Sequence, residues 1–212
     1  MATLKRRKHV ASKHVKDKKK KPECGGRSPK QKGSKFDLGI CRILTAWITG
    51  APQPEILWRT ATSGGRATMG RKVGIDVGMH GDIMSIDARS KWLTNNFFFE
   101  CKSYSKIDFS LILEGKGNVI AWWNKAVTQA AQAKKWPLMI FKQNNSQTYI
   151  AGYFDMPLFK EFPMTENDAI YIKKLRSPNY IGKIVIIPLD QFLAAMAPKS
   201  LERFLSRGRR KA

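Results

Sequence analysis

The chain has 212 residues, of which 39 are Lys or Arg and 16 are Asp or Glu, so its formal net charge is +23. This length fits one domain with tails, and the hydrophobic fraction of 42% lies slightly below the usual globular range, which indicates that part of the chain does not pack. The charge excludes an acidic solvating protein and disfavours a neutral metabolite enzyme. It favours a polyanionic partner, DNA or RNA rather than a membrane surface.

The cysteine pattern and the apolar runs bear on the compartment. Three cysteines at wide spacing form neither a disulfide framework nor a CxxC metal site, so we expect a reducing cytoplasm. No apolar run approaches the roughly 20 residues of a membrane span, and the basic N-terminus lacks the apolar segment of a signal peptide. We therefore expect a cytoplasmic protein without a membrane partner.

The positive charge is concentrated at the two ends of the chain. Residues 1–34 carry 13 Lys or Arg against two acidic residues, and residues 199–212 carry six against one, which leaves a net charge of +7 for residues 35–198. We predict a disordered basic arm over 1–34, a folded domain over 35–198 and a basic tail over 199–212, because the ends lack apolar residues that could offset their ordering entropy. Such segments bind nucleic acid, and a localisation signal is the alternative.

Hydrophobic periodicity predicts alternating helices and strands within the folded domain. The predicted elements are, in chain order, a helix over 35–49, strands over 56–60, 82–87 and 92–105, a helix over 118–135, strands over 137–142, 148–154 and 182–188, and a helix over 189–196. A glycine-rich basic loop is expected over 61–81, and loops of that length are usually functional or disordered. An antiparallel hairpin around residues 88–95 is expected to join the second and third strands. This order predicts a mixed α/β domain.

Two charged side chains follow three phenylalanines on the third predicted strand. Because strand side chains alternate with period two, Glu100 and Lys102 point to the same side, and the hairpin brings Asp82 near Glu100. Mg²⁺ prefers one or two carboxylates together with water and phosphate oxygens, so this trio suits phosphodiester cleavage. Lys102 would orient the attacking water or balance charge on the phosphate. The alternative is an ordinary ion pair at the surface of an edge strand.

The spacing Gly81-Asp82-(x)17-Glu100-Cys101-Lys102, followed by a helix, resembles the PD-(D/E)-x-K nuclease superfamily. The resemblance implies a restriction-endonuclease-like αβββαβ core with a mixed central sheet flanked by helices. Gly81 takes the place of the motif's leading proline, a substitution that changes no ligand. Residues 32–37 and 58–68 further resemble the phage-encoded Holliday-junction-resolvase-like members, and the similarity extends over about residues 32–144.

The resemblance assigns roles to the residues that match the motif. Asp82 and Glu100 would bind the metal ion, and the carbonyl oxygen of Cys101 would add a third ligand. Lys102 would be the catalytic lysine. Asp37, one methylene shorter than the family's glutamate on the first helix, would assist the metal site. The cofactor implied is Mg²⁺, with Mn²⁺ as a substitute.

Several other polar residues are candidates for the active site, and each also has a simpler structural interpretation. Gln129 on the second long helix either faces the site or is an exposed helix residue. Asp87 is favoured as a turn-initiating residue over a metal ligand, and Glu55, Asp76 and His80 are favoured as solvated side chains. The basic residues expected to contact DNA phosphates are Arg59, Arg66, Arg71 and Lys72.

We predict from these patterns a Mg²⁺-dependent DNA endonuclease, phage-encoded and acting on Holliday junctions or other branched DNA in recombination, replication or packaging. Junction resolvases act as symmetric dimers, so the resemblance also implies a homodimer. A non-catalytic basic nucleic-acid-binding protein is the alternative. An RNA-associated protein of ribosomal type is a third interpretation.

Overall fold

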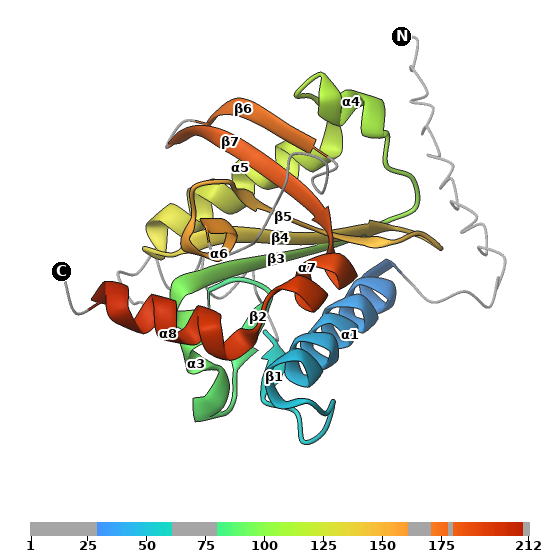
Figure 1. Ribbon diagram of the computed structural model, residues 1–212. Coiled ribbons are helices and arrows are strands. Elements are labelled where there is room, and N and C mark those ends of the chain that lie inside the picture. Colours follow the sequence, from blue (N-terminus) through green and yellow to red (C-terminus); the bar gives the residue numbers. More distant parts are fainter. Residues whose placement is uncertain (1–28, 61–79, 161–170, 178–179, 210–212) are drawn as a thin grey trace, which may run out of the picture.

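Helices and strands alternate along the chain of the computed structural model, which describes residues 29–60, 80–160, 171–177 and 180–209 (Figure 1). The elements are α1 (Pro29–Thr49), β1 (Leu57–Arg59), β2 (Ile83–Ser85), the 3₁₀ turn η1 (Ala88–Ser90), α3 (Lys91–Asn96), β3 (Phe97–Tyr104), α4 (Phe109–Leu113), α5 (Gly117–Gln132), β4 (Trp136–Gln143), β5 (Thr148–Tyr153), α6 (Pro157–Lys160), β6 (Tyr171–Ser177), β7 (Tyr180–Pro188), α7 (Leu189–Ala195) and α8 (Pro198–Arg209). None of the described helices combines the length and the apolar composition needed to cross a membrane.

The central sheet has five strands in the order β3-β4-β5-β7-β6, so β3 lies at one edge. β3 pairs with β4 in parallel, and the register places Glu100 opposite Met139 and Lys102 opposite Phe141. All other neighbours in this sheet are antiparallel. β4 and β5 pair across a tight turn in which Asn145 adopts a positive φ of 55°, as expected for an asparagine in a turn. β4 and β5 therefore form an antiparallel hairpin.

β3 is packed on both faces. Phe98 lies in a small buried cluster with Ala126 and Ala130 of α5, whose short side chains let this helix come close to the strand. The residues on either side of Phe98 point to the other face, because side chains alternate along a strand, and α1 packs there (Figure 1). The helix α1 contributes Ile40 and Leu44 to the main core. The candidate residues of β3 therefore lie between two helices.

The element order α1-β1-β2-β3-α5-β4 confirms the αβββαβ expectation, and the mixed sheet flanked by helices is confirmed as well. The predicted hairpin between the second and third strands is wrong. β2 pairs with β1 in a separate two-stranded sheet, and η1 and α3 occupy the segment that was expected to be the turn. Asp87 starts η1 by accepting a hydrogen bond from the Arg89 N–H at 2.8 Å, so its interpretation as a turn residue is confirmed.

The C-terminal segment differs from the predicted disordered tail, because residues 198–209 form the helix α8. Leu201 and Leu205 are buried on one side of this helix, and Phe204 packs against the same core. These three residues have the i, i+3, i+4 spacing of a helix face. The high proportion of Lys and Arg around them nevertheless makes the segment resemble a disordered tail in composition. At the other end of the chain, α1 begins at Pro29, six residues before the predicted start, and residues 1–28 lie outside the described part.

The packing of α8 predicts a large loss of stability when Leu201 is shortened. Leu201 is fully buried, so Leu201→Ala is expected to lower the free energy of unfolding by about 2–5 kcal/mol through lost apolar contacts and a cavity. Urea denaturation followed by tryptophan fluorescence measures this change. Leu113→Ala is the matched control, because Leu113 is 60% exposed and its replacement is expected to change stability by no more than about 0.5 kcal/mol. Equal effects of the two variants would show that α8 does not belong to the core.

Candidate active site

Asp82 is fixed by hydrogen bonds to the free edge of β3. Its backbone N–H donates to the carbonyl oxygen of Phe99 at 2.7 Å, and its Oδ2 accepts a hydrogen bond from the Cys101 N–H at 2.8 Å. Its own carbonyl oxygen accepts from the N–H of Thr60, which follows β1, at 2.9 Å. Asp82 therefore lies beside the strand that carries Glu100, as the sequence predicts, although no hairpin connects the two.

The close approach of the chain before Asp82 requires glycine. Gly81 has a φ of 85°, and a Cβ at this position would lie 2.6 Å from the carbonyl oxygen of Phe99 and 3.0 Å from its nitrogen. Proline, whose ring fixes φ near −65°, cannot adopt this conformation. Gly81 in place of the motif's proline leaves the Asp82 carboxylate in position. In this chain the local backbone conformation requires glycine at this position.

Glu100 and Lys102 form an ion pair on the α5 side of β3. Glu100 is 6% exposed, and Lys102 Nζ contacts its Oε1 while about a third of the lysine side chain reaches solvent. Burial, reinforced by the negative charge of Asp82, raises the pKa of Glu100 even though Lys102 acts in the opposite direction. Burial opposes the charged form of Lys102, but the Glu100 and Asp82 carboxylates raise the pKa of the lysine overall. Lys102 is therefore a fixed ammonium beside two carboxylates.

Asp37 joins this group from α1. It is half-buried, and burial together with the negative charge of Asp82 raises its pKa from 3.8 to about 6, while Arg59 and Lys102 act in the opposite direction. The structure thus brings Asp37, Asp82 and Glu100 close enough to repel one another. A bound cation or a proton would relieve this repulsion.

The helix α5 supplies a cation that the sequence analysis missed. Lys125 is exposed, and its positive charge lowers the pKa of Glu100 in the same direction as Lys102 does. Gln129, the predicted residue, lies one turn further along the helix and is half-buried. Within the described residues its side chain makes no hydrogen bond to Asp82, Glu100 or Lys102. The signal that could have indicated Lys125 is its i−4 spacing from Gln129, which places both on one helix face.

The predicted phosphate-binding residues are placed only in part. Arg59 ends β1 next to Asp37, and its buried Nε has no hydrogen-bond partner among the described residues. Arg66, Arg71 and Lys72 lie outside the described residues, as does Asp76. Glu55 contacts Gln53 and lies 3.6 Å from Arg42, and His80 is half-buried immediately before Gly81.

The oxygen donors at this edge fit a hard divalent cation. Among the described residues no three His, Cys, Asp or Glu side chains gather tightly enough to enclose a metal ion. Mg²⁺, however, commonly uses one or two carboxylates and keeps several waters. Asp82 and Glu100 supply two carboxylates, and the Cys101 carbonyl points to the same edge as its N–H, which bonds Asp82. The donor set is thus one that Mg²⁺ accepts, and a cation there would offset the repulsion between the carboxylates.

Comparison with known protein families gives one match that covers most of the chain. The family described as "Phage putative PDDEXK endonuclease" matches residues 28–203, more than four fifths of the sequence. Neither the curated proteins nor the solved structures contain a significant match. The matched segment begins one residue before α1 and ends within α8, so it covers α1 to α7 in full and the first half of α8.

Proposed function

Because the chain belongs to the phage PD-(D/E)-x-K endonuclease family, we propose that it is a Mg²⁺-dependent enzyme that hydrolyses DNA phosphodiester bonds at the free edge of β3. The observation that carries this proposal is the attachment of Asp82 to the Cys101 N–H, next to the buried Glu100–Lys102 pair. Burying a carboxylate beside a second carboxylate destabilises a fold unless a cation or a substrate uses the pair.

Each residue of the proposed site has a distinct role. Asp82, Glu100 and the Cys101 carbonyl hold the metal ion, which when bound would polarise the phosphate and lower the pKa of a water molecule. Lys102 keeps its proton, so its ammonium can orient the attacking water and stabilise negative charge on the phosphate. Asp37 would assist from α1 as an additional hydrogen-bond acceptor at this site.

Two cations flank the carboxylates and suit the phosphates of the substrate. The charge of Arg59 lowers the pKa of Asp37, and the planar set of donors on its guanidinium matches phosphate oxygens. Lys125 stands on α5, and its charge lowers the pKa of Glu100. We propose that these two residues position the DNA backbone, together with Arg66, Arg71 and Lys72, and that Gln129 contributes a polar contact from α5.

The substrate we propose is branched DNA, a four-way junction above all, in phage recombination, replication or packaging in the host cytoplasm. Two symmetric cuts in such a junction suit a homodimer. Cleavage assays on linear, nicked and four-way DNA of equal length test this selectivity, and sedimentation tests the dimer. Strong salt-dependent binding without cleavage of any of these substrates would favour the non-catalytic nucleic-acid-binding alternative.

The proposal predicts that cleavage depends on a divalent ion. EDTA is expected to abolish the reaction, and Mg²⁺ or Mn²⁺ added in excess is expected to restore it, because Asp82 and Glu100 bind the ion through oxygen atoms. Gel analysis of a labelled four-way junction measures the products. Circular dichroism in EDTA serves as the control, since an unchanged spectrum shows that the protein is still folded without the ion. Cleavage that continues in EDTA would contradict the metal assignment.

A further inference from the structure

A second basic site lies between α1 and the turn that joins β4 to β5. It is a groove of about 670 Å³ whose charged side chains are Lys32 and Lys35 from α1 and Lys142 from the end of β4. None of the described residues that line it is acidic, and none of the three lysines forms an ion pair within the described part of the chain. Three uncompensated cations in a concave surface produce a positive potential that favours a polyanion.

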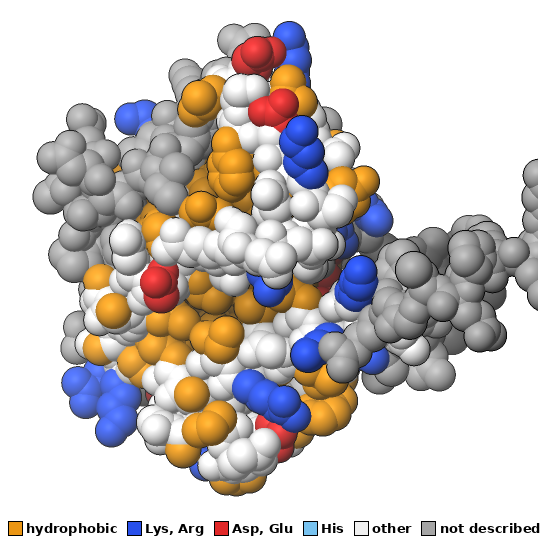
Figure 2. Space-filling model, turned by 90° about the vertical axis from the view of Figure 1, so that its right-hand side faces the viewer, with side chains coloured by type: hydrophobic (Ala, Val, Ile, Leu, Met, Phe, Trp, Pro, Cys, Tyr) orange, Lys and Arg blue, Asp and Glu red, His pale blue; other side chains and the backbone are white. Residues whose placement is uncertain are grey.

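The floor of the groove is apolar. Phe36 and Ile40 are buried beneath it, whereas Ile43 is 43% exposed, and Lys142 Nζ lies 5.4 Å from the centroid of the Phe36 ring. Figure 2 looks onto the side of the molecule where α1 begins and shows apolar side chains at the surface next to Lys and Arg side chains. Asn144 adds an amide group at the rim. Phosphates alone would not use such a floor, whereas the sugars and bases of an unpaired strand would.

The groove adjoins the candidate active site through neighbouring residues of two elements. On α1, the groove residue Phe36 immediately precedes Asp37. On β3, the groove residue Ser103 immediately follows Lys102. The side chains of Lys102 and Ser103 leave β3 on opposite faces, but β3 is the edge strand of its sheet, so a chain of nucleotides can pass around this edge from the active site to the groove.

We propose that this groove binds an unpaired DNA strand that extends from the cleaved phosphate, with its phosphates on Lys32, Lys35 and Lys142 and its bases over the apolar floor. This inference rests on the proposed nuclease function, because it assigns the groove to the substrate of the same site. The inference also goes beyond the proposed nuclease function, since none of the three lysines belongs to the catalytic motif. The expected substrate therefore carries a single-stranded segment next to the cut.

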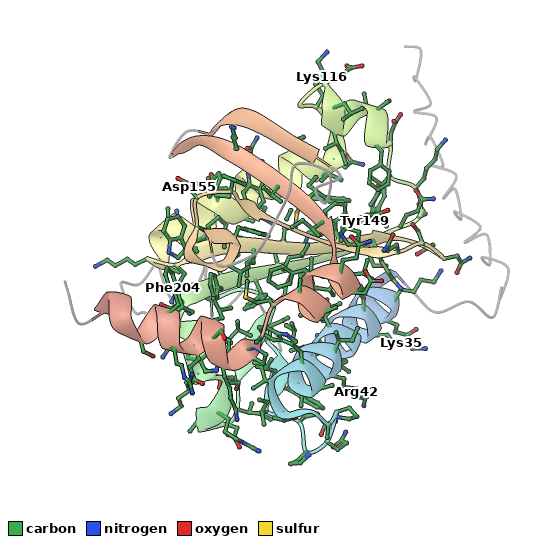
Figure 3. The ribbon with its side chains drawn as sticks, in the orientation of Figure 1. Lys35, Arg42, Lys116, Tyr149, Asp155 and Phe204 are labelled. Atoms are coloured by element: carbon green, nitrogen blue, oxygen red, sulfur yellow. The ribbon has the colours of Figure 1, made fainter. Side chains whose placement is uncertain are left out.

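The first experiment measures binding of the full-length protein to a fluorescent single-stranded oligonucleotide in EDTA, at several salt concentrations. Replacing all three groove lysines by glutamine is expected to reduce the slope of log Kobs against log salt by about two, since each phosphate contact on a single strand contributes roughly 0.7. Lys116→Gln is the control. Lys116 is exposed near α4, away from Lys35 (Figure 3), and its loss is expected to leave binding and cleavage unchanged.

A second pair of variants occupies the groove without removing any lysine. Gly39 lines it, and a Cβ there would meet no atom within 4 Å, so a longer side chain can project into the space. Gly39→Gln is the control for Gly39→Glu, because Glu and Gln have similar helix propensity. Gly39→Glu is expected to weaken single-strand binding at least about tenfold relative to Gly39→Gln, because the carboxylate repels phosphate. Circular dichroism checks that both variants fold.

The outcomes separate this inference from the proposed function. An unchanged salt slope in the triple variant, or equal binding by the two Gly39 variants, would overturn the groove assignment even if Mg²⁺-dependent cleavage is intact. Equal losses on a blunt duplex and on the single strand would overturn the choice of an unpaired strand. Loss of single-strand binding in the groove variants, with no cleavage by the wild-type protein, would support the groove and reject the nuclease.

Discussion

Glu100→Gln is expected to reduce Mg²⁺-dependent DNA cleavage by about 100-fold or more without lowering stability. The change removes a carboxylate of the proposed metal site but keeps the size of the side chain. Burial and Asp82 already disfavour the ionised form of Glu100, so the neutral amide is expected to leave the free energy of unfolding unchanged or to raise it. Lys102 keeps the nearby Asp82 carboxylate as a source of negative charge, and about a third of its side chain reaches solvent. Cleavage rates and urea denaturation of the same preparations measure both effects.

The sequence offers a matched control for this variant. Glu114 and Lys116 form a second Glu-x-Lys triplet, in which the two charged groups lie 3.4 Å apart and both side chains are largely exposed. Glu114→Gln removes the same charge from the same local pattern and is expected to leave cleavage unchanged. If Glu100→Gln cleaves DNA as fast as Glu114→Gln does, Glu100 is only a structural ion-pair partner.

Gly81→Ala is expected to impair both stability and cleavage. The added Cβ would lie 2.6 Å from the Phe99 carbonyl oxygen, and alanine is strained at a φ of 85°. Strain of this kind costs about 1–3 kcal/mol. Relief of the clash moves Asp82 away from the Cys101 N–H, and a displacement of about 1 Å can reduce catalysis about 100-fold. Urea denaturation and single-turnover cleavage, corrected for the folded fraction, measure the two losses.

Gly33→Ala is the control for the Gly81 variant. Gly33 lies within α1, and a Cβ there meets no atom within 4 Å, so alanine is expected to stabilise the helix by about 0.5–1 kcal/mol and to leave cleavage unchanged. A Gly81→Ala protein that is as stable and as active as Gly33→Ala would show that the backbone contact between Gly81 and Phe99 is not needed.

The part of the site that lies on one strand could be predicted from the sequence. Glu100 and Lys102 share a side because side chains alternate along β3, and the apolar run before them predicts that strand directly. The sequence also predicts correctly that Asp82 lies beside Glu100, but the hairpin on which that prediction depends is wrong. The contact comes from the hydrogen bonds at the edge of β3 and from the backbone conformation of Gly81, which no periodicity encodes.

Other features depend on tertiary packing that local sequence does not specify. Residues 91–96 form α3 rather than the turn and strand that the sequence predicts, because the Asp87 cap starts η1 and α3 continues directly from it. Lys125 influences the pKa of Glu100 because α5 packs on β3 at the short Ala126 and Ala130 side chains. The helix α8 was missed because its few buried residues are outnumbered by charged ones.

The central claim is that Asp82 and Glu100 hold one divalent ion at the edge of β3. Anomalous diffraction from crystals soaked in Mn²⁺ tests it most directly, because Mn²⁺ takes the same oxygen ligands as Mg²⁺ and can be located by its scattering. The account predicts one strong peak within bonding distance of the Asp82 and Glu100 carboxylates and the Cys101 carbonyl oxygen, absent from crystals of Asp82→Asn. A peak elsewhere, or none at this edge at saturating Mn²⁺, would contradict it.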